Sequence, residues 1–250
     1  MDWCDGFREL NCWPSWVTRL SPGVQVKVAV ARKADALIEA GGEEGERKRL
    51  HRVPLEAFST MYSFCTLLAG YKGPKWELLT TKAAEDEVLS LRDAMGRTVM
   101  HWAAQGDSRA KLVGVIAARD AGLVNAKDNA GGTPLHVAAM DGSAAVALVL
   151  LAVGANTQAK NMDGGTPLHI AAVHNCEVVA RDLLAASAAK DAKDGGGQTP
   201  LHVAAQHGSE AVARALLAAD ADTNAKDGYG NTPLRLAQMR GRTALVALLS

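Results

Sequence analysis

The stretch DGGGQTPLHVAAQHG, residues 194–208, combines a triple glycine, a Thr-Pro step and two histidines. Its central part occurs three times almost unchanged, as TPLHVAA at 133–139, TPLHIAA at 166–172 and TPLHVAA at 199–205. The threonines of these copies and of an altered copy, TPLRLAQ at 232–238, recur at a constant interval. A looser copy, TVMHWAA, begins at Thr98, two residues out of phase with the others. A fixed period of about 33 residues is typical of a repeat protein.

Each copy predicts a helix-turn-helix unit. Threonine is a good N-cap and proline suits the first helical position, so each Thr-Pro step predicts the start of a helix. Gly142, Asn175 and Gly208 then end that helix, and a second apolar segment such as 210–220 follows. Clusters of Asp, Asn and Gly between the units, as in NAKDNAGG at 125–132, predict hairpin-like loops. Because one unit cannot bury its own apolar face, we expect several units to stack.

The stretches DNAGGTPLHVAAMDG and DGGGQTPLHVAAQHG resemble ankyrin repeats. The resemblance covers the units 93–127, 128–160, 161–193, 194–226 and a shortened 227–250. It implies an all-α repeat solenoid of stacked helix-turn-helix units with short β-hairpin loops. It also implies a protein-binding surface without enzymatic activity, and hydrogen bonds between repeats made by the motif histidines, which are His136, His169 and His202.

The last unit departs from the pattern. Arg235 replaces the motif histidine, Gln238 replaces an alanine, and Arg240 and Arg242 follow. This polar drift is expected of a terminal unit, so we interpret it as a C-terminal cap. The chain stops where the second helix of this unit would end, which leaves open a longer product or a truncated gene model.

We expect residues 1–92 to form a helical N-terminal region before the repeats. They hold nine of the eleven aromatic residues. In 54–92, two apolar segments flank a YKGP turn, which predicts a degenerate helical capping unit. Residues 1–53 have no assigned fold. Within them, 23–42 fits either a strand followed by a helix or one longer helix, and NCWPSW at 11–16 is either a packing segment or an exposed aromatic anchor.

Composition limits the partners and the location of the protein. Lys plus Arg and Asp plus Glu both total 27, so no overall field attracts nucleic acid, and we expect none as a partner. The four cysteines form no CxxC pair, which favours a reducing compartment. No signal peptide fits, and the longest apolar run, 144–155, is too short for the roughly 20 residues of a membrane span. We expect an intracellular, cytoplasmic or nuclear, monomeric protein without membrane insertion.

The chemical alternatives to a binding surface are weak. The glycine run lacks the lysine and Ser/Thr of a phosphate loop, and no nucleophile or acid–base constellation marks a catalytic site. His174 and His207 recur at one repeat position, but equivalent positions on packed helices lie roughly 8–10 Å apart, which is too far to share a zinc ion. We therefore predict no catalytic residue, no cofactor and no metal.

A lysine also recurs with the period, as Lys127, Lys160, Lys193 and Lys226. These four side chains are either a basic ridge for an acidic partner or solvated surface, and the aspartates beside three of them favour the second interpretation.

The leading hypothesis is a protein–protein interaction module or scaffold that binds a protein of unknown identity through its finger tips and inner helix face. The alternatives are a small regulatory or enzymatic head in residues 1–92 that the repeats target, and an adaptor in a degradation or signalling complex. Tyr229, Arg97 and Arg240 are the expected anchors. The full predicted partner-binding set is Met95, Arg97, Asn129, Met140, Asp141, Met162, Asp163, His174, Gln206, His207, Tyr229, Asn231, Met239 and Arg240.

Overall fold

The computed structural model describes residues 89, 90 and 92–250. The chain divides into two compact units, Met1–Asp93 and Ala94–Ser250, and the account below concerns the second unit. The expectations for residues 1–53, including the segment 23–42 and the NCWPSW cluster, lie outside the described residues. So does nearly all of the capping unit predicted at 54–92.

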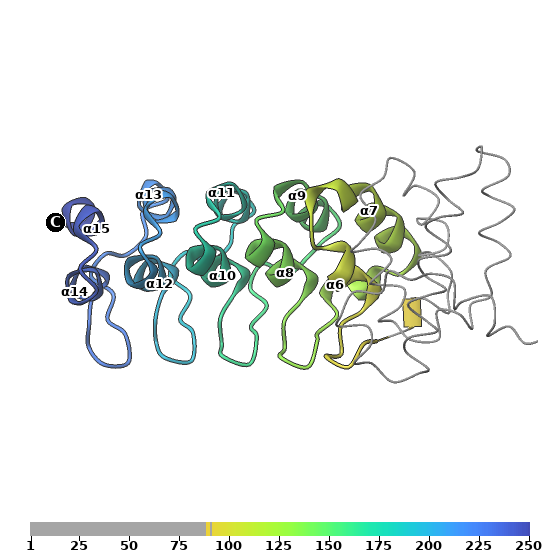
Figure 1. Cartoon of the computed structure of the whole chain (residues 1–250), viewed down its shortest axis with the longest axis horizontal. Coiled ribbons are helices and arrows are strands. Elements are labelled where there is room, and N and C mark those ends of the chain that lie inside the picture. Colours follow the sequence, from red (N-terminus) through yellow and green to blue (C-terminus); the bar gives the residue numbers. More distant parts are fainter. Residues whose placement is uncertain (1–88, 91) are drawn as a thin grey trace, which may run out of the picture. The chain divides into compact units, whose positions relative to one another are not determined.

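The second unit is a stack of five helix pairs. The first helices of the pairs form one row, the second helices form another, and the connecting loops all project to one side, as Figure 1 shows. The pairs are α6 (Val99–Ala103) with α7 (Ala110–Arg119), α8 (Pro134–Asp141) with α9 (Ala144–Ala152), α10 (Pro167–His174) with α11 (Glu177–Ala185), α12 (Pro200–His207) with α13 (Glu210–Ala218), and α14 (Pro233–Met239) with α15 (Thr243–Leu249). The predicted all-α repeat solenoid is confirmed.

The loops between pairs are turns, and the described part of the chain contains no strand. Each loop still folds back on itself as a hairpin does. In the loop before α8, the Asp128 N–H donates to the Gly132 carbonyl at 2.9 Å, and Asp128 Oδ1 accepts the amides of Ala130 and Gly132 at 2.9 and 2.8 Å. An aspartate that satisfies its own loop in this way fixes the backbone without a regular ladder.

The Thr-Pro steps begin helices as predicted. Thr133, Thr166 and Thr199 are extended N-caps, and their hydroxyls accept from the third helical amide while a proline occupies the first turn. The helices end at left-handed residues, Gly142 at φ 72°, Asn175 at φ 54° and Gly208 at φ 86°. Glycine adopts this conformation without steric cost and asparagine tolerates it, which explains the residue types found there.

The core repeats with the sequence. Leu135, Leu168 and Leu201 in the first helices have no exposed surface, and neither do Leu150, Leu183 and Leu216 in the second helices. Alanines alongside them let the helices approach closely, so each unit covers the apolar face of the next.

The first unit explains the phase difference of Thr98. Ile116 is the buried counterpart of Leu150, but its offset from Thr98 is one position longer than the offset of Leu150 from Thr133. The other extra residue falls after the second helix, where the 3-10 helix Ala121–Asn125 precedes the next loop. Two single insertions, one on each side of this buried position, therefore keep the apolar face of α7 toward the stack.

Candidate partner-binding surface

Buried histidines tie each unit to the next. Nε2 of His136 lies 3.1 Å from the Gly165 carbonyl, and Nε2 of His169 lies 3.0 Å from the Gln198 carbonyl, 29 residues further along in both cases. His101 and His202 make the corresponding contacts with Gly132 and Asn231 at 3.1 and 3.0 Å. The hydrogen bonds between repeats that the resemblance implies are present.

The contacts of these histidines determine their protonation. The amide of Thr166 donates to Nδ1 of His169 at 3.1 Å, so Nδ1 must be unprotonated and Nε2 must carry the hydrogen that reaches the Gln198 carbonyl. Burial lowers the pKa of His169 and of His136 below the ordinary value for histidine, against the opposing effect of the backbone carbonyls they contact. The neutral side chain is thus the form that holds the stack together.

The recurring lysines form a second ladder between units. Nζ of Lys127, Lys160 and Lys193 donates to the backbone carbonyl of the lysine 33 residues further along, at 3.1, 2.7 and 2.9 Å. Neither alternative drawn from the sequence, a partner-binding ridge or a solvated surface, includes this contact between repeats. The ladder uses the ammonium groups to position successive loops.

The loop tips are also joined by backbone bonds. The Met162 N–H donates to the Ala130 carbonyl at 2.9 Å, the Gly195 N–H to the Asp163 carbonyl at 2.8 Å, and the Gly228 N–H to the Gly196 carbonyl at 2.8 Å. These bonds hold the side chains at the tips in a fixed order along one edge. The surface they form is therefore largely preorganised.

Large apolar side chains are exposed on this edge and on the inner helices, which are the first helices of the pairs. Tyr229 is 90% exposed and Met162 is 78% exposed at the tips, and Met239 is 67% exposed at the end of α14. Met95 and Met140 are exposed as well. Because Thr133, Thr166, Thr199 and Thr232 begin equivalent helices, the ends of these helices form one row, which we call the helix-end row and which consists of Asp141, His174, His207 and Arg240.

Several predicted residues make contacts within the protein instead of standing free. The Arg97 guanidinium lies 4.1 Å from the centre of the Trp102 ring. Gln206 Oε1 accepts from Gln198 Nε2 at 3.2 Å. The remaining members with side-chain contacts are Asn129, which donates to the Ala94 carbonyl, Asp141, which accepts from Ser143, and Asn231, which contacts Asp227 and Arg235.

Arg242 is a neighbour of the helix-end row that sequence reasoning placed only in the terminal cap. Its side chain lies over Gly208, because a Cβ built on that glycine would lie 3.2 Å from Arg242 Nε. Burial, followed by the charges of Arg242, His174 and Arg240, lowers the pKa of His207. No pattern in the sequence reveals this approach, since Arg242 belongs to the next unit and is distant from Gly208 along the chain.

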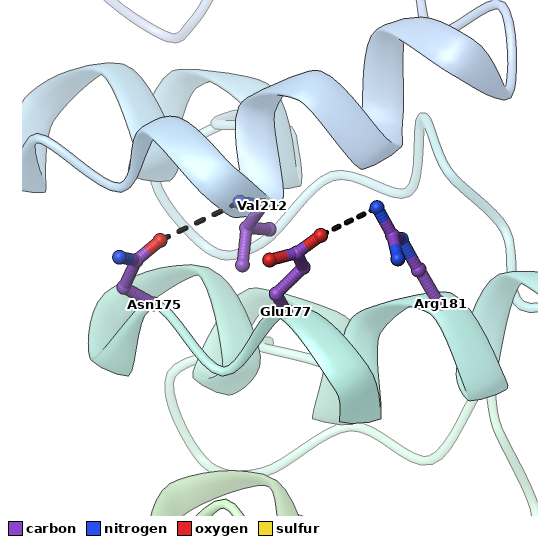
Figure 2. A network of polar contacts seen from close by, with 4 residues as sticks. All are labelled: Asn175, Glu177, Arg181 and Val212. Atoms are coloured by element: carbon purple, nitrogen blue, oxygen red, sulfur yellow. Dashed lines mark hydrogen bonds and ion pairs between the residues drawn. The ribbon is translucent and has the colours of Figure 1, made fainter.

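The outer helices, which are the second helices of the pairs, carry ion pairs within one helix. Figure 2 shows Asn175 Oδ1 accepting from the Val212 amide at 3.4 Å, beside an ion pair between Glu177 and Arg181 at 2.5 Å. Arg214 pairs with Glu210 at 3.6 Å at the equivalent position of the next unit. Pairs this exposed contribute at most about 0.5 kcal/mol each.

Neither a metal cluster nor a membrane span occurs within residues 89, 90 and 92–250. No group of three or more His, Cys, Asp or Glu side chains in that part of the chain could hold a metal ion. None of its helices combines the length and apolarity needed to cross a bilayer.

Two family models match the chain. One, described as ankyrin repeats in three copies, matches residues 112–194, and the other, described as ankyrin repeats in many copies, matches residues 183–237. A search of curated proteins finds no match.

Proposed function

Because the chain belongs to the ankyrin-repeat family, whose members generally mediate protein–protein interaction, we propose that it binds a partner protein through its loop tips and inner helix face. Members of the family are typically binding modules without enzymatic activity. The partner-binding set predicted from the sequence defines the proposed surface, and Arg242 is added to it.

The main support for the proposal is that methionine and tyrosine side chains are exposed at the loop tips and at the ends of the first helices. Met162 and Tyr229 project from the loop tips, and Met140 and Met239 from the ends of α8 and α14. Flexible, polarizable methionines adapt to a partner surface, and tyrosine is enriched among residues that dominate binding energy. The exposed apolar side chains of the outer helices, such as Leu148 and Val178, are aliphatic.

The scaffold beneath this surface favours binding. The histidine contacts, the lysine ladder and the bonds between loop tips hold each unit against its neighbour before any partner arrives. A surface that is already ordered loses less conformational entropy on association, so more of the contact energy appears as affinity.

Tyr229 and Arg240 remain the proposed anchors, since both are exposed. Arg97 becomes a different kind of candidate because it is half-buried against Trp102. We propose that this pair presents an aromatic surface to the partner, with the guanidinium holding the ring in place.

The test is quantitative capture with the full chain as bait, comparing the wild type with Tyr229→Ala, Arg240→Ala and an outer-face control, Leu148→Ala. We expect each of the first two changes to reduce recovery of the same partner about tenfold or more, the size of a hot-spot effect, while the control retains it. Circular dichroism checks that all variants keep their helix content. Equal recovery by all variants, or loss only with Leu148→Ala, would refute the proposed surface.

The broader roles remain predictions from the sequence. They are a scaffold or adaptor role, a regulatory head in residues 1–92, a monomeric state and an intracellular location. The head concerns residues outside the described part of the chain almost entirely.

A further inference from the structure

Three basic side chains gather at the inner corner of the last two units. His207 ends α12, Arg240 follows α14 and Arg242 precedes α15, and all three are exposed. Arg242 lies over Gly208, and the charges of both arginines act on His207. We call these three residues the basic corner.

No carboxylate in residues 89, 90 and 92–250 forms an ion pair with the arginines of the basic corner. In these two units Glu210 pairs with Arg214 on the outer helix, and Asp227 accepts the amides of Tyr229 and Asn231 within its own loop. The corner therefore has donors to offer to an acidic group from outside. A guanidinium binds a carboxylate through two parallel hydrogen bonds, which makes arginine well suited to that contact.

The neighbours of the basic corner indicate what kind of anion fits. Met239, immediately before Arg240 in the chain, is 67% exposed. A segment that carries both carboxylates and apolar side chains would satisfy the two features together. This combination occurs in acidic stretches of proteins.

The other end of the helix-end row argues against a uniformly charged polymer. Two units before His207 the row carries Asp141, which is exposed. Asp107 of the first unit accepts the amide of Ala145, four residues after Asp141, at 2.8 Å. A nucleic acid laid along the row would bring its phosphates to Asp141, whereas recognition of a nucleic-acid backbone needs cations along the whole contact.

We propose that the basic corner binds an acidic segment of the partner protein, with its carboxylates on Arg240 and Arg242 and an adjacent apolar side chain on Met239. This inference rests on the proposed function and specifies the chemistry of the partner. Complementarity along the row also orients the segment, with its acidic part over α14 and any basic residue toward Asp141.

The experiment selects phage-displayed random dodecapeptides on the full chain and compares the wild type with Arg242→Glu and with Arg214→Glu. The control makes the same change of charge on the outer face, where Arg214 is exposed. We expect the wild type and the control to enrich peptides with Asp or Glu next to apolar residues, and Arg242→Glu to lose that enrichment. The strongest peptide, made synthetically and labelled with fluorescein, should bind at least tenfold more weakly to Arg242→Glu by fluorescence anisotropy.

Two further measurements sharpen the test. A carboxylate held at the corner favours the imidazolium of His207, so affinity for the peptide should rise as the pH falls, and His207→Gln should remove that rise. The groups that act electrostatically on His207 are Arg242, His174 and Arg240. Binding should also weaken with added salt, as expected for exposed charges.

The outcomes separate this inference from the proposed function. Enrichment of neutral or basic peptides, equal binding by Arg242→Glu, or tighter binding of a fluorescein-labelled single-stranded oligonucleotide than of the peptide would overturn the acidic segment. If partner capture still depends on Tyr229 in that case, the proposed function stands alone. If capture does not depend on Tyr229 but acidic peptides bind the corner, the proposed surface fails and the corner survives as a separate site.

Discussion

Three glycines of the loop tips allow backbone strain to be separated from contact between repeats. Gly197 has φ 74°, and a Cβ there would lie 2.8 Å from the Gly228 amide nitrogen. Gly230 has a similar φ of 78° but nothing within 4 Å of an added Cβ. Gly196 is not left-handed, and an added Cβ would meet Asp194 Oδ1 at 3.5 Å, an ordinary contact. Alanine at each position therefore tests a different combination of the two effects.

The magnitudes follow from these geometries. At Gly230 an alanine encounters only the left-handed backbone, which costs about 1–2 kcal/mol for a residue with a side chain. At Gly197 the same strain is joined by a contact with backbone that cannot move aside, next to the bond from the Gly228 amide to the Gly196 carbonyl at 2.8 Å. Weakening that bond adds about 1 kcal/mol, so we expect a total loss of about 2–3 kcal/mol. At Gly196 an alanine should be neutral or stabilising by up to about 0.5 kcal/mol, because it restricts the unfolded chain.

The assay is urea unfolding of the full chain followed by far-UV circular dichroism at pH 7, with hydrogen exchange of the Gly228 amide as a local measurement. We expect Gly196→Ala to be the most stable variant, Gly230→Ala to be less stable and Gly197→Ala to be the least stable. Hydrogen exchange of the Gly228 amide should be faster only in Gly197→Ala. Equal destabilisation by Gly197→Ala and Gly230→Ala would show that the contact between loops contributes nothing. A loss at Gly196→Ala as large as the other two would refute the assignment of strain altogether.

Three further predictions concern contacts between units and within the outer helices. Burial lowers the pKa of His169 in the folded protein, so the neutral histidine stabilises the fold above its unfolded pKa and this stabilisation is lost as the pH falls toward the folded pKa. The urea midpoint should therefore fall less between pH 7.5 and pH 5 in His169→Gln than in the wild type, and an equal fall would contradict the role of the neutral histidine. Lys160→Met should lower the free energy of unfolding by less than about 1 kcal/mol, because the bond to the Lys193 carbonyl at 2.7 Å is lost. Lys226 has no next lysine in the ladder, so Lys226→Met should leave stability unchanged, and equal effects of the two variants in thermal melts would count against the ladder. Asp182→Ala should raise the free energy of unfolding at pH 7 by about 1 kcal/mol, because Oδ2 of Asp182 is buried without a hydrogen-bond partner and burial raises the pKa of this carboxyl. The gain should shrink in acid as the wild-type carboxyl is protonated, and a variant less stable than the wild type in urea titrations would refute this prediction.

Most of the repeat fold could be predicted from the repeat period. The recurrence of Thr-Pro at a constant interval placed the starts of α8, α10, α12 and α14, and the residues after each helix placed its end. These features are local, because N-caps, first-turn prolines and left-handed glycines act within one turn of helix. The role of the motif histidines followed from the family resemblance, and the structure confirms it with the contacts of His136 and its equivalents.

The candidate surface could be predicted only in part. Exposure of Tyr229 and Met162 follows from their positions at loop tips, and Met140 and Met239 share one repeat position near the end of a first helix. The stacking of Arg97 on Trp102 and the engagement of Gln206 by Gln198 were not foreseen, because both depend on rotamers chosen in three dimensions. The surface residues themselves stay a prediction until the variants are measured.

The sequence by itself determined the units, the helix boundaries from Thr133 to Thr232 and the apolar faces that must stack, because those depend on spacing and on local capping chemistry. Only the tertiary structure decided which side chains meet across units. Lys160 reaches the Lys193 carbonyl and Arg242 lies over Gly208 because each unit is placed against its neighbour by a packed core, so residues far apart in the chain become adjacent. The same stacking turns a row of unlike charges into a surface with an acidic and a basic end.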